Sequence, residues 1–144
     1  MTMTEAIQSF IARYADFQGR SRRSEFWWVI LASVIIGAVW GALIGLIGGA
    51  YGTGLNAIGL LLSGIMFLFG LAVLIPGIAL SVRRFHDLGQ TGWLLLVFVL
   101  LGLIPIVGIL ATIGLYIWFA MPGKVGPNQY GPDPKGGHDV GVFS

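Results

Sequence analysis

The sequence contains no cysteine, and charged residues make up only 10% of its 144 residues. The lack of cysteine excludes disulfide bonds, thiol catalysis and metal sites built on thiolates. A soluble domain usually carries about 25% charged residues, and a small one needs many polar groups to cover its large relative surface. Because hydrophobic residues make up 56% of this chain, its composition favours lipid as the solvent.

Charge is absent from two long stretches, Phe26 to Val82 with 57 residues and Leu88 to Gly123 with 36 residues. About 20 apolar residues, rising 1.5 Å each, cross the hydrocarbon core of a bilayer. The first stretch therefore accommodates two spans and the second accommodates one. The sequence predicts an all-α integral membrane protein, a small bundle of three transmembrane helices in a single domain over residues 1–134. The predicted spans cover residues 26–47, 56–80 and 93–120, and residues 135–144 are predicted to be a disordered tail.

Residues 4–17, before the first span, show a helical repeat of apolar residues. The spacing predicts an amphipathic helix. Its position next to a span favours a location in the membrane interface, and packing on the protein's own cytosolic loops is the alternative. The apolar residues of this repeat are Ile7, Phe10, Ile11, Tyr14 and Phe17.

The third apolar segment is interrupted by Pro105. Its 28 residues from Trp93 to Ala120 would extend about 42 Å as a straight helix, which exceeds the ~30 Å core. It forms either one helix bent at the proline or two half-helices that enter the membrane and return. We expect the single bent helix, because a turn in hydrocarbon leaves backbone groups unpaired at several kcal/mol each.

The basic residues indicate an orientation. Four arginines precede the first span, none lies in the first connection, two follow the second span, and two lysines lie in the tail. Since cytoplasmic loops are enriched in Lys and Arg, we expect a cytoplasmic N-terminus. Three spans would then place the tail from Met121 onward on the opposite face, although the two tail lysines favour the cytoplasm.

Charged residues at the ends of the spans form a candidate interfacial polar cluster. It is interpreted either as a site for anionic lipid headgroups or a partner, or as a set of arginines that only fixes the topology. A charge at the membrane edge is costly unless it is paired, so we expect Glu25 to pair with Arg83 or Arg84. Asp87 should likewise pair with an arginine of residues 20–23. The cluster comprises Arg20, Arg22, Arg23, Glu25, Arg83, Arg84, His86 and Asp87.

His86 and Asp87 are adjacent, and such a pair raises the question of metal binding or general-base catalysis. Both need further ligands or acid–base groups in a fixed geometry, so a capping or hydrogen-bonding role for His86 is favoured. We therefore predict no catalytic residue, no cofactor and no metal site. The net charge of +2 is too small to indicate a nucleic-acid partner.

Glycines recur at every fourth position of the first span. In lipid, close backbone approach drives helix association, so the glycine stripe predicts a packing face within the chain or between copies. A pore lining is the alternative, but no polar side chains accompany the stripe. The stripe consists of Gly37, Gly41, Gly45 and Gly49.

Four motifs occur in a characteristic order: Phe-x-Gly-Arg-x-x-Arg-x-Glu-Phe-Trp (17–27), Arg-x-His-Asp-x-Gly-x-x-Gly-Trp (84–93), Ile-Pro-x-x-Gly (104–108), and Pro-Gly followed by Asn-x-Tyr-Gly-Pro-Asp-Pro (122–134). In this combination the chain is similar to a bacterial inner-membrane family known as domain of unknown function 805, the YhaH-like proteins. The resemblance implies a multi-spanning protein of the inner membrane with no established activity. It supplies no catalytic residues.

The expected function is structural or regulatory, through association with lipid, with a second copy of the chain or with a larger membrane complex. A small transporter or channel component is the first alternative, and a lipid-modifying enzyme that uses His86 and Asp87 is the second. A transporter should carry polar groups near the middle of the membrane. The spans offer only Ser33, Ser63 and Thr112, which argues against transport.

Overall fold

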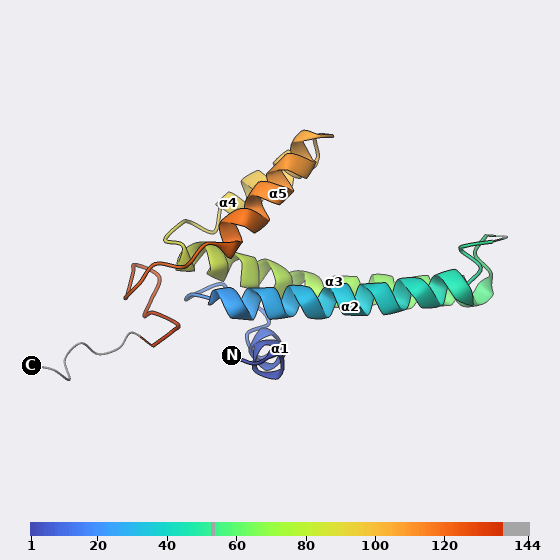
Figure 1. Cartoon of the computed structure of the whole chain (residues 1–144), viewed down its shortest axis with the longest axis horizontal. Helices are drawn as coiled ribbons and strands as arrows, with labels where there is room; N and C mark the ends of the chain where they lie inside the picture. Colours follow the sequence, from blue (N-terminus) through green and yellow to red (C-terminus); the bar gives the residue numbers. More distant parts are fainter. Residues whose placement is uncertain (53, 137–144) are drawn as a thin grey trace, which may run out of the picture.

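The computed structural model describes residues 1–52 and 54–136, and its regular structure there is helical apart from one isolated bridge (Figure 1). The all-α prediction is confirmed. The helices are α1 (Met3–Ala12), α2 (Arg23–Leu46), α3 (Ala57–Asp87), α4 (Leu94–Gly102) and α5 (Val107–Ala120).

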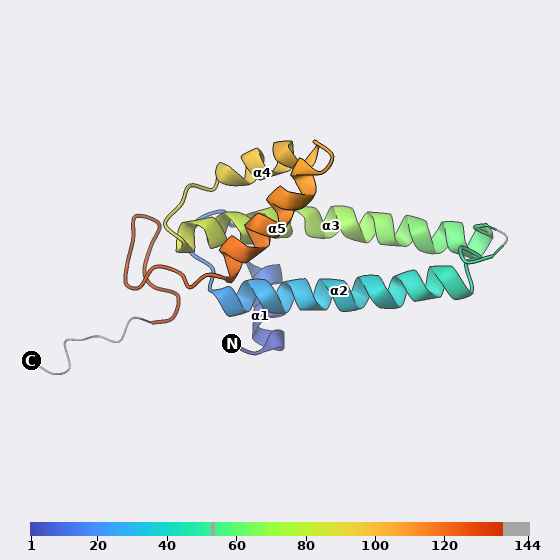
Figure 2. The same ribbon diagram turned by 45° about the horizontal axis from the view of Figure 1, so that its top comes forward.

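Helices α2 and α3 form a long antiparallel pair that sets the length of the molecule (Figures 1 and 2). Both are long enough and apolar enough to cross a membrane. We call the end of the pair at Arg23 and Asp87 the polar end, and the end at Leu46 and Ala57 the loop end. Helix α3 runs seven residues beyond the predicted limit at residue 80, so residues 83–87 are helical rather than a connection.

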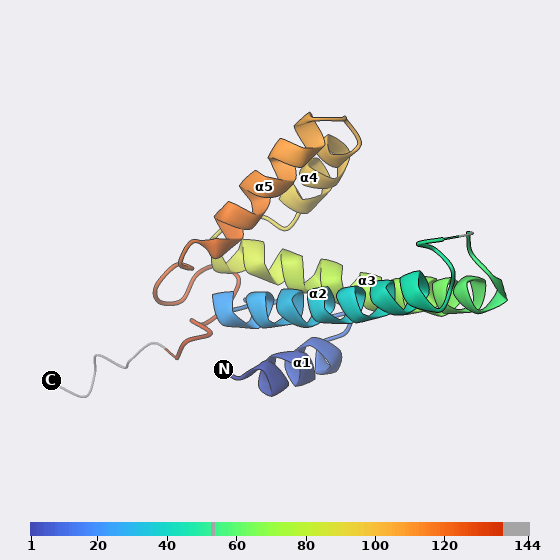
Figure 3. The same cartoon turned by 45° about the vertical axis from the view of Figure 1, so that its right-hand side comes forward.

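Helix α1 lies across α2 and α3 in the half of the pair next to the polar end (Figure 3). Thr2 and Glu5 form a reciprocal capping box at its start, which satisfies two otherwise free N–H groups. The helix ends at Ala12, five residues earlier than predicted. Ala6 is fully buried and α1 contacts both long helices, while its location in the membrane interface stays a prediction.

The single bent helix expected for residues 93–120 is wrong, because α4 and α5 are separate helices that fold back on each other (Figure 2). The hairpin brings the end of α5 to the polar end, where Phe119 contacts both Phe26 and Phe85 at ring-centroid distances of 4.8 Å. The absence of a side chain at Gly108 makes this fold-back feasible, because a Cβ there would overlap the backbone of Gly102.

In the hairpin turn at residues 103–106, most backbone N–H groups form local hydrogen bonds. The cost of unpaired backbone groups in hydrocarbon is therefore small enough for the turn to form. Pro105 has no N–H group to leave unpaired. The N–H of Val107 bonds the carbonyl of Pro105 across Ile106, a γ-turn that places Ile106 at a φ of +68°. Four N–H groups donate to nearby carbonyls over N···O distances of 2.7 to 3.2 Å, and they belong to Leu103, Ile104, Val107 and Gly108.

The glycine stripe does not form the contact between α2 and α3. A Cβ placed on Gly37 or Gly41 meets no atom within 4 Å, so the prediction of a close helix neighbour within the chain is wrong for both. Gly45 packs against the side chain of Tyr51 rather than against a helix. Gly49 lies in the turn with a φ of +83°, a conformation that favours glycine.

A close backbone approach occurs instead between Gly48, in the turn after α2, and Gly59, in the first turn of α3. A Cβ on either glycine would overlap the backbone of the other. These two segments of the chain therefore touch backbone to backbone at the loop end. Packing of the open Gly37 and Gly41 against a second copy of the chain stays a prediction.

Candidate functional site

The structure gathers the predicted polar cluster at the polar end, although its residues are as many as 67 positions apart in the sequence. Five of the eight are buried, and they carry three positive and two negative charges. Arg22 and His86 are half-buried and Arg23 is exposed. The buried residues are Arg20, Glu25, Arg83, Arg84 and Asp87.

Asp87 lies at the centre of one half of the cluster. Its carboxylate accepts hydrogen bonds from Nε of Arg20 at 3.0 Å and from Nη1 of Arg84. The predicted pairing of Asp87 with an arginine of residues 20–23 is thus present. A Cβ on Gly123 would overlap this carboxylate, so the tail passes in direct contact with it.

Arg84 binds the C-terminal end of α5. Its Nε and Nη2 donate to the carbonyl of Phe119 at 3.1 and 2.9 Å, and Nη2 also donates to the carbonyl of Met121. Helix α5 has no basic residue in its own last turn, so a cation from α3 supplies the interaction that stabilises a helix C-terminus. Arg84 is fully buried and thereby joins α3 to the hairpin.

Arg20 binds the tail in a similar way. Its Nη1 and Nη2 donate to the carbonyls of Gly126 and Lys124, while its Nε donates to Asp87. The N–H of Lys124 donates to the carbonyl of Asp87 at 2.9 Å. The two arginines, Arg20 and Arg84, therefore bind the end of α5 and the start of the tail through one shared carboxylate.

Glu25 and Arg83 form the other half of the cluster, and the predicted ion pair between them is present. Their closest atoms, Oε1 and Nη2, are 3.9 Å apart, which is too long for a hydrogen bond. Glu25 accepts hydrogen bonds from the hydroxyls of Ser9 at 2.8 Å and Ser21 at 2.6 Å. The buried guanidinium of Arg83 has no hydrogen-bond partner among residues 1–52 and 54–136.

His86 makes the hydrogen bonds that the sequence analysis favoured over catalysis. Its Nδ1 donates to the carbonyl of Gly19 at 3.0 Å. Its ring stacks on Tyr130 with centroids 3.9 Å apart, and its own carbonyl accepts from Asn128 Nδ2 at 2.9 Å. The carboxylate of Asp87 faces Arg20 and Arg84 instead, so the two adjacent side chains have different partners. Within the described part of the chain, no three potential His or carboxylate ligands gather to hold a metal ion.

The tail from Met121 to Gly136 is held at the polar end by Arg20 and Asp87, and the sequence did not indicate these contacts. It is a series of turns, with a bridge between Asn128 and Gly131. The backbone N–H groups of Lys135 and Gly126 donate to Asp133 and hold the pKa of its carboxyl below the ordinary value. The alternating prolines and glycines of residues 122–134 predict such turns. Of residues 135–144, predicted to be disordered, Lys135 and Gly136 form a turn with Asp133, and residues 137–144 lie outside the described residues.

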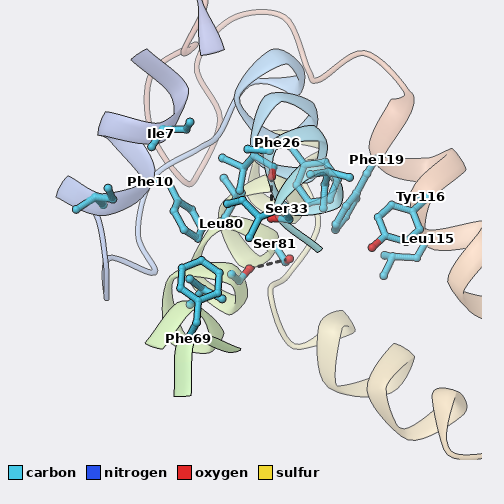
Figure 4. Close-up of a pocket in the computed structure, with 17 residues that line it drawn as sticks. Ile7, Phe10, Phe26, Ser33, Phe69, Leu80, Ser81, Leu115, Tyr116 and Phe119 are labelled. Atoms are coloured by element: carbon cyan, nitrogen blue, oxygen red, sulfur yellow. Dashed lines mark hydrogen bonds between the residues drawn. The ribbon is translucent and has the colours of Figure 1, made fainter. Parts of the chain in front are cut away.

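An apolar cavity of about 490 Å³, also missed from the sequence, lies between α1, α2, α3 and α5 (Figure 4). Phe10, Phe26, Phe69 and Phe119 are among its lining residues. It depends on how four helices meet in three dimensions, which no local sequence pattern encodes.

Comparison with known proteins gives matches over most of the chain. The family described as "Protein of unknown function (DUF805)" matches residues 14–132. The chain is 38% identical to the inner membrane protein YhaI of Escherichia coli K12 over 130 residues, which cover 90% of this chain and 94% of YhaI. It is 34% identical to the inner membrane protein YhaH of the same strain over 126 residues, covering 87% and 92% of the two chains. No solved structure matches.

Proposed function

The chain belongs to the DUF805 family of proteins of unknown function. We propose that it serves in the inner membrane as a structural protein that holds a folded platform at the cytoplasmic face, where a larger membrane complex associates with it. The platform consists of residues 19–22, 83–89 and 121–136. Two helices span the membrane, and the α4–α5 hairpin enters the cytoplasmic leaflet and returns. The relatives YhaI and YhaH are named inner membrane proteins, which supports the location.

The distribution of basic residues supports this orientation. All eight Lys and Arg residues lie before α2, at its first residue, near the end of α3 or after α5, and the connection between α2 and α3 contains none. The returning hairpin places the tail beside Asp87. Both termini and every basic residue then face the cytoplasm, in agreement with the positive-inside rule, and the two tail lysines no longer conflict with the topology.

The shared use of Asp87 by Arg20 and Arg84 carries the proposal of a structural role. These buried guanidinium groups are occupied by the protein's own carboxylate and carbonyls. Hydrogen bonds to charged groups contribute about 1.5–3 kcal/mol each, so the network is suited to fixing a tail that has no helix of its own. Arginines engaged in this way are not available to a headgroup or a substrate.

The same contacts weigh against the alternatives. A transporter needs free polar groups along its spans, whereas the hydroxyls of Ser33 and Thr112 donate to carbonyls of their own helices at 2.8 Å. A lipid-modifying enzyme needs His86 with an acid–base partner, whereas the ring of His86 is stacked on Tyr130. Both observations support the structural proposal.

Photo-crosslinking in living cells tests the platform. Val125 projects from it with 96% of its surface exposed, and Leu46 at the loop end, 77% exposed, is a matched apolar control. A photoreactive residue at position 125 should give a discrete protein adduct, which the additional change Arg20→Ala should abolish because it releases the tail. Equal adducts from both positions, or an adduct indifferent to Arg20→Ala, would contradict the proposal.

A further inference from the structure

We propose that the apolar cavity binds one acyl chain of an anionic phospholipid from the leaflet at the polar end, with the phosphate of that lipid held by Arg23. The inference concerns a different part of the molecule from the platform and does not depend on the platform having a partner. Figure 4 shows the cavity with its phenylalanine rings and hydroxyl groups.

The chemistry of the lining selects an apolar ligand. The only polar side chains among the 17 lining residues are Ser33, Ser81 and Tyr116. Ser33 donates to the carbonyl of Val29 at 2.8 Å and Ser81 to that of Gly77 at 2.9 Å, so neither needs a ligand to satisfy it. A volume of about 490 Å³ lies within the range of about 300–1,000 Å³ that is typical of small-molecule sites.

The length of the cavity matches one leaflet. Its lining residues extend on α2 from Phe26 to Ile36 and on α3 from Phe69 to Ser81, which corresponds to about 15 and 18 Å at 1.5 Å per residue. Half of a ~30 Å hydrocarbon core is about 15 Å. The cavity starts at the polar end and is elongated along the helices. An extended acyl chain has the same elongated shape.

Charge at the polar end selects an anionic headgroup. Arg23 is exposed and uses one of its nitrogens, Nη1, on the carbonyl of Ala120 at 3.2 Å, whereas a guanidinium carries five N–H donors. Arg23 lies close to the cavity, because Phe26, three residues later on α2, and Phe119, the neighbour of Ala120 on α5, both line it. The buried cluster behind it holds three arginines against two carboxylates, so its excess positive charge also attracts a phosphate.

Two glycines of α3 provide a matched pair of variants. A Cβ on Gly77 or on Gly70 meets no atom within 4 Å, so a side chain can begin at either position without a clash. Gly77 lines the cavity and Gly70 does not. Gly77→Leu should therefore fill the cavity, while Gly70→Leu makes the same chemical change outside it. If Gly77→Leu does not fold, Val73→Phe, at another lining residue, replaces it.

Native mass spectrometry of the purified full-length chain tests the proposal, with phosphatidylglycerol and phosphatidylethanolamine of identical chains added in turn. The wild type and Gly70→Leu should retain one phosphatidylglycerol, and Gly77→Leu should bind it about tenfold more weakly, which corresponds to ~1.4 kcal/mol. Arg23→Gln should keep chain binding but lose the preference for phosphatidylglycerol. Equal retention by the two glycine variants, or an unchanged preference in Arg23→Gln, would overturn the proposal.

Discussion

The hydroxyl of Tyr14 donates to the carbonyl of Ala72 at 2.5 Å, and this carbonyl is the one that Pro76 leaves without its helical partner. Proline has no N–H to bond the carbonyl four residues earlier, and an unsatisfied carbonyl in hydrocarbon costs several kcal/mol. A residue in the turn after α1 thus replaces the missing donor. The contact explains how α3 continues through Pro76, and it fixes the end of α1 to the middle of α3.

Tyr14→Phe should lower the free energy of unfolding by about 1–3 kcal/mol, because it leaves a carbonyl unpaired. In a Pro76→Ala background the backbone N–H restored at position 76 can bond the carbonyl of Ala72, so the same change should cost much less. Unfolding in mixed micelles measures both values, and Tyr51→Phe in the exposed turn serves as control. A cost for Tyr14→Phe that is the same in both backgrounds would contradict the role assigned to Tyr14.

Asp87→Asn should release the tail. The change leaves the buried guanidinium groups of Arg20 and Arg84 without their counter-charge, a loss of about 3–5 kcal/mol for a buried pair. Arg20 also binds the carbonyl of Lys124, which belongs to the peptide bond that trypsin cleaves. Trypsin should therefore cut after Lys124 much faster in Asp87→Asn than in wild type. Glu5→Gln, at an exposed cap, should leave the rate unchanged, and protection that survives in Asp87→Asn would count against the network.

Arg84→Lys should behave as a severe change although it preserves the charge. A lysine ammonium is a single point of donation and cannot reproduce the planar fork that reaches Phe119, Met121 and Asp87 together. We expect a loss of about 2–4 kcal/mol, from at least two charge-assisted hydrogen bonds, whereas the exposed Arg23→Lys should cost little. Equal unfolding free energies for the two variants would refute the capping of α5 by Arg84.

Ile106→Gly should increase stability. A β-branched residue at φ +68° is strained by about 1–3 kcal/mol, and glycine adopts this conformation freely. Ile104 in the same turn has no positive φ, so Ile104→Gly should be neutral or destabilising. Comparing the unfolding free energies of the two variants checks the γ-turn, and a loss of stability in Ile106→Gly would exclude it.

Some of these features could be predicted from the sequence and others could not. The charge-free stretches predicted both ends of α2 to within a few residues, because bilayer thickness sets the length of a span. The ion pairs of Glu25 and Asp87 followed from the cost of a lone charge at the membrane edge. The hairpin at Pro105 was not predicted. The single bent helix was expected because a turn in hydrocarbon leaves backbone groups unpaired, but local hydrogen bonds pair most of these groups.

Other features depend on where helices meet in three dimensions. The Gly37 and Gly41 repeat predicted a packing face, but the close backbone contact is between Gly48, in the turn after α2, and Gly59 of α3. The partner of the Ala72 carbonyl is 58 residues away in sequence, and no local pattern indicates it. The apolar cavity arises from the arrangement of four helices, each of which has an ordinary apolar sequence.

The side of the membrane on which the chain ends tests the account most directly, since the platform and the hairpin both depend on it. A reporter that is active only in the cytoplasm should be fused after Ser144, and the same reporter inserted between Tyr51 and Gly52 in the α2–α3 connection provides the control. If the hairpin returns to the cytoplasmic face, the C-terminal fusion gives a strong signal and the insertion gives none. Activity from neither fusion, with both proteins present in the membrane, would place the tail outside and contradict the hairpin topology.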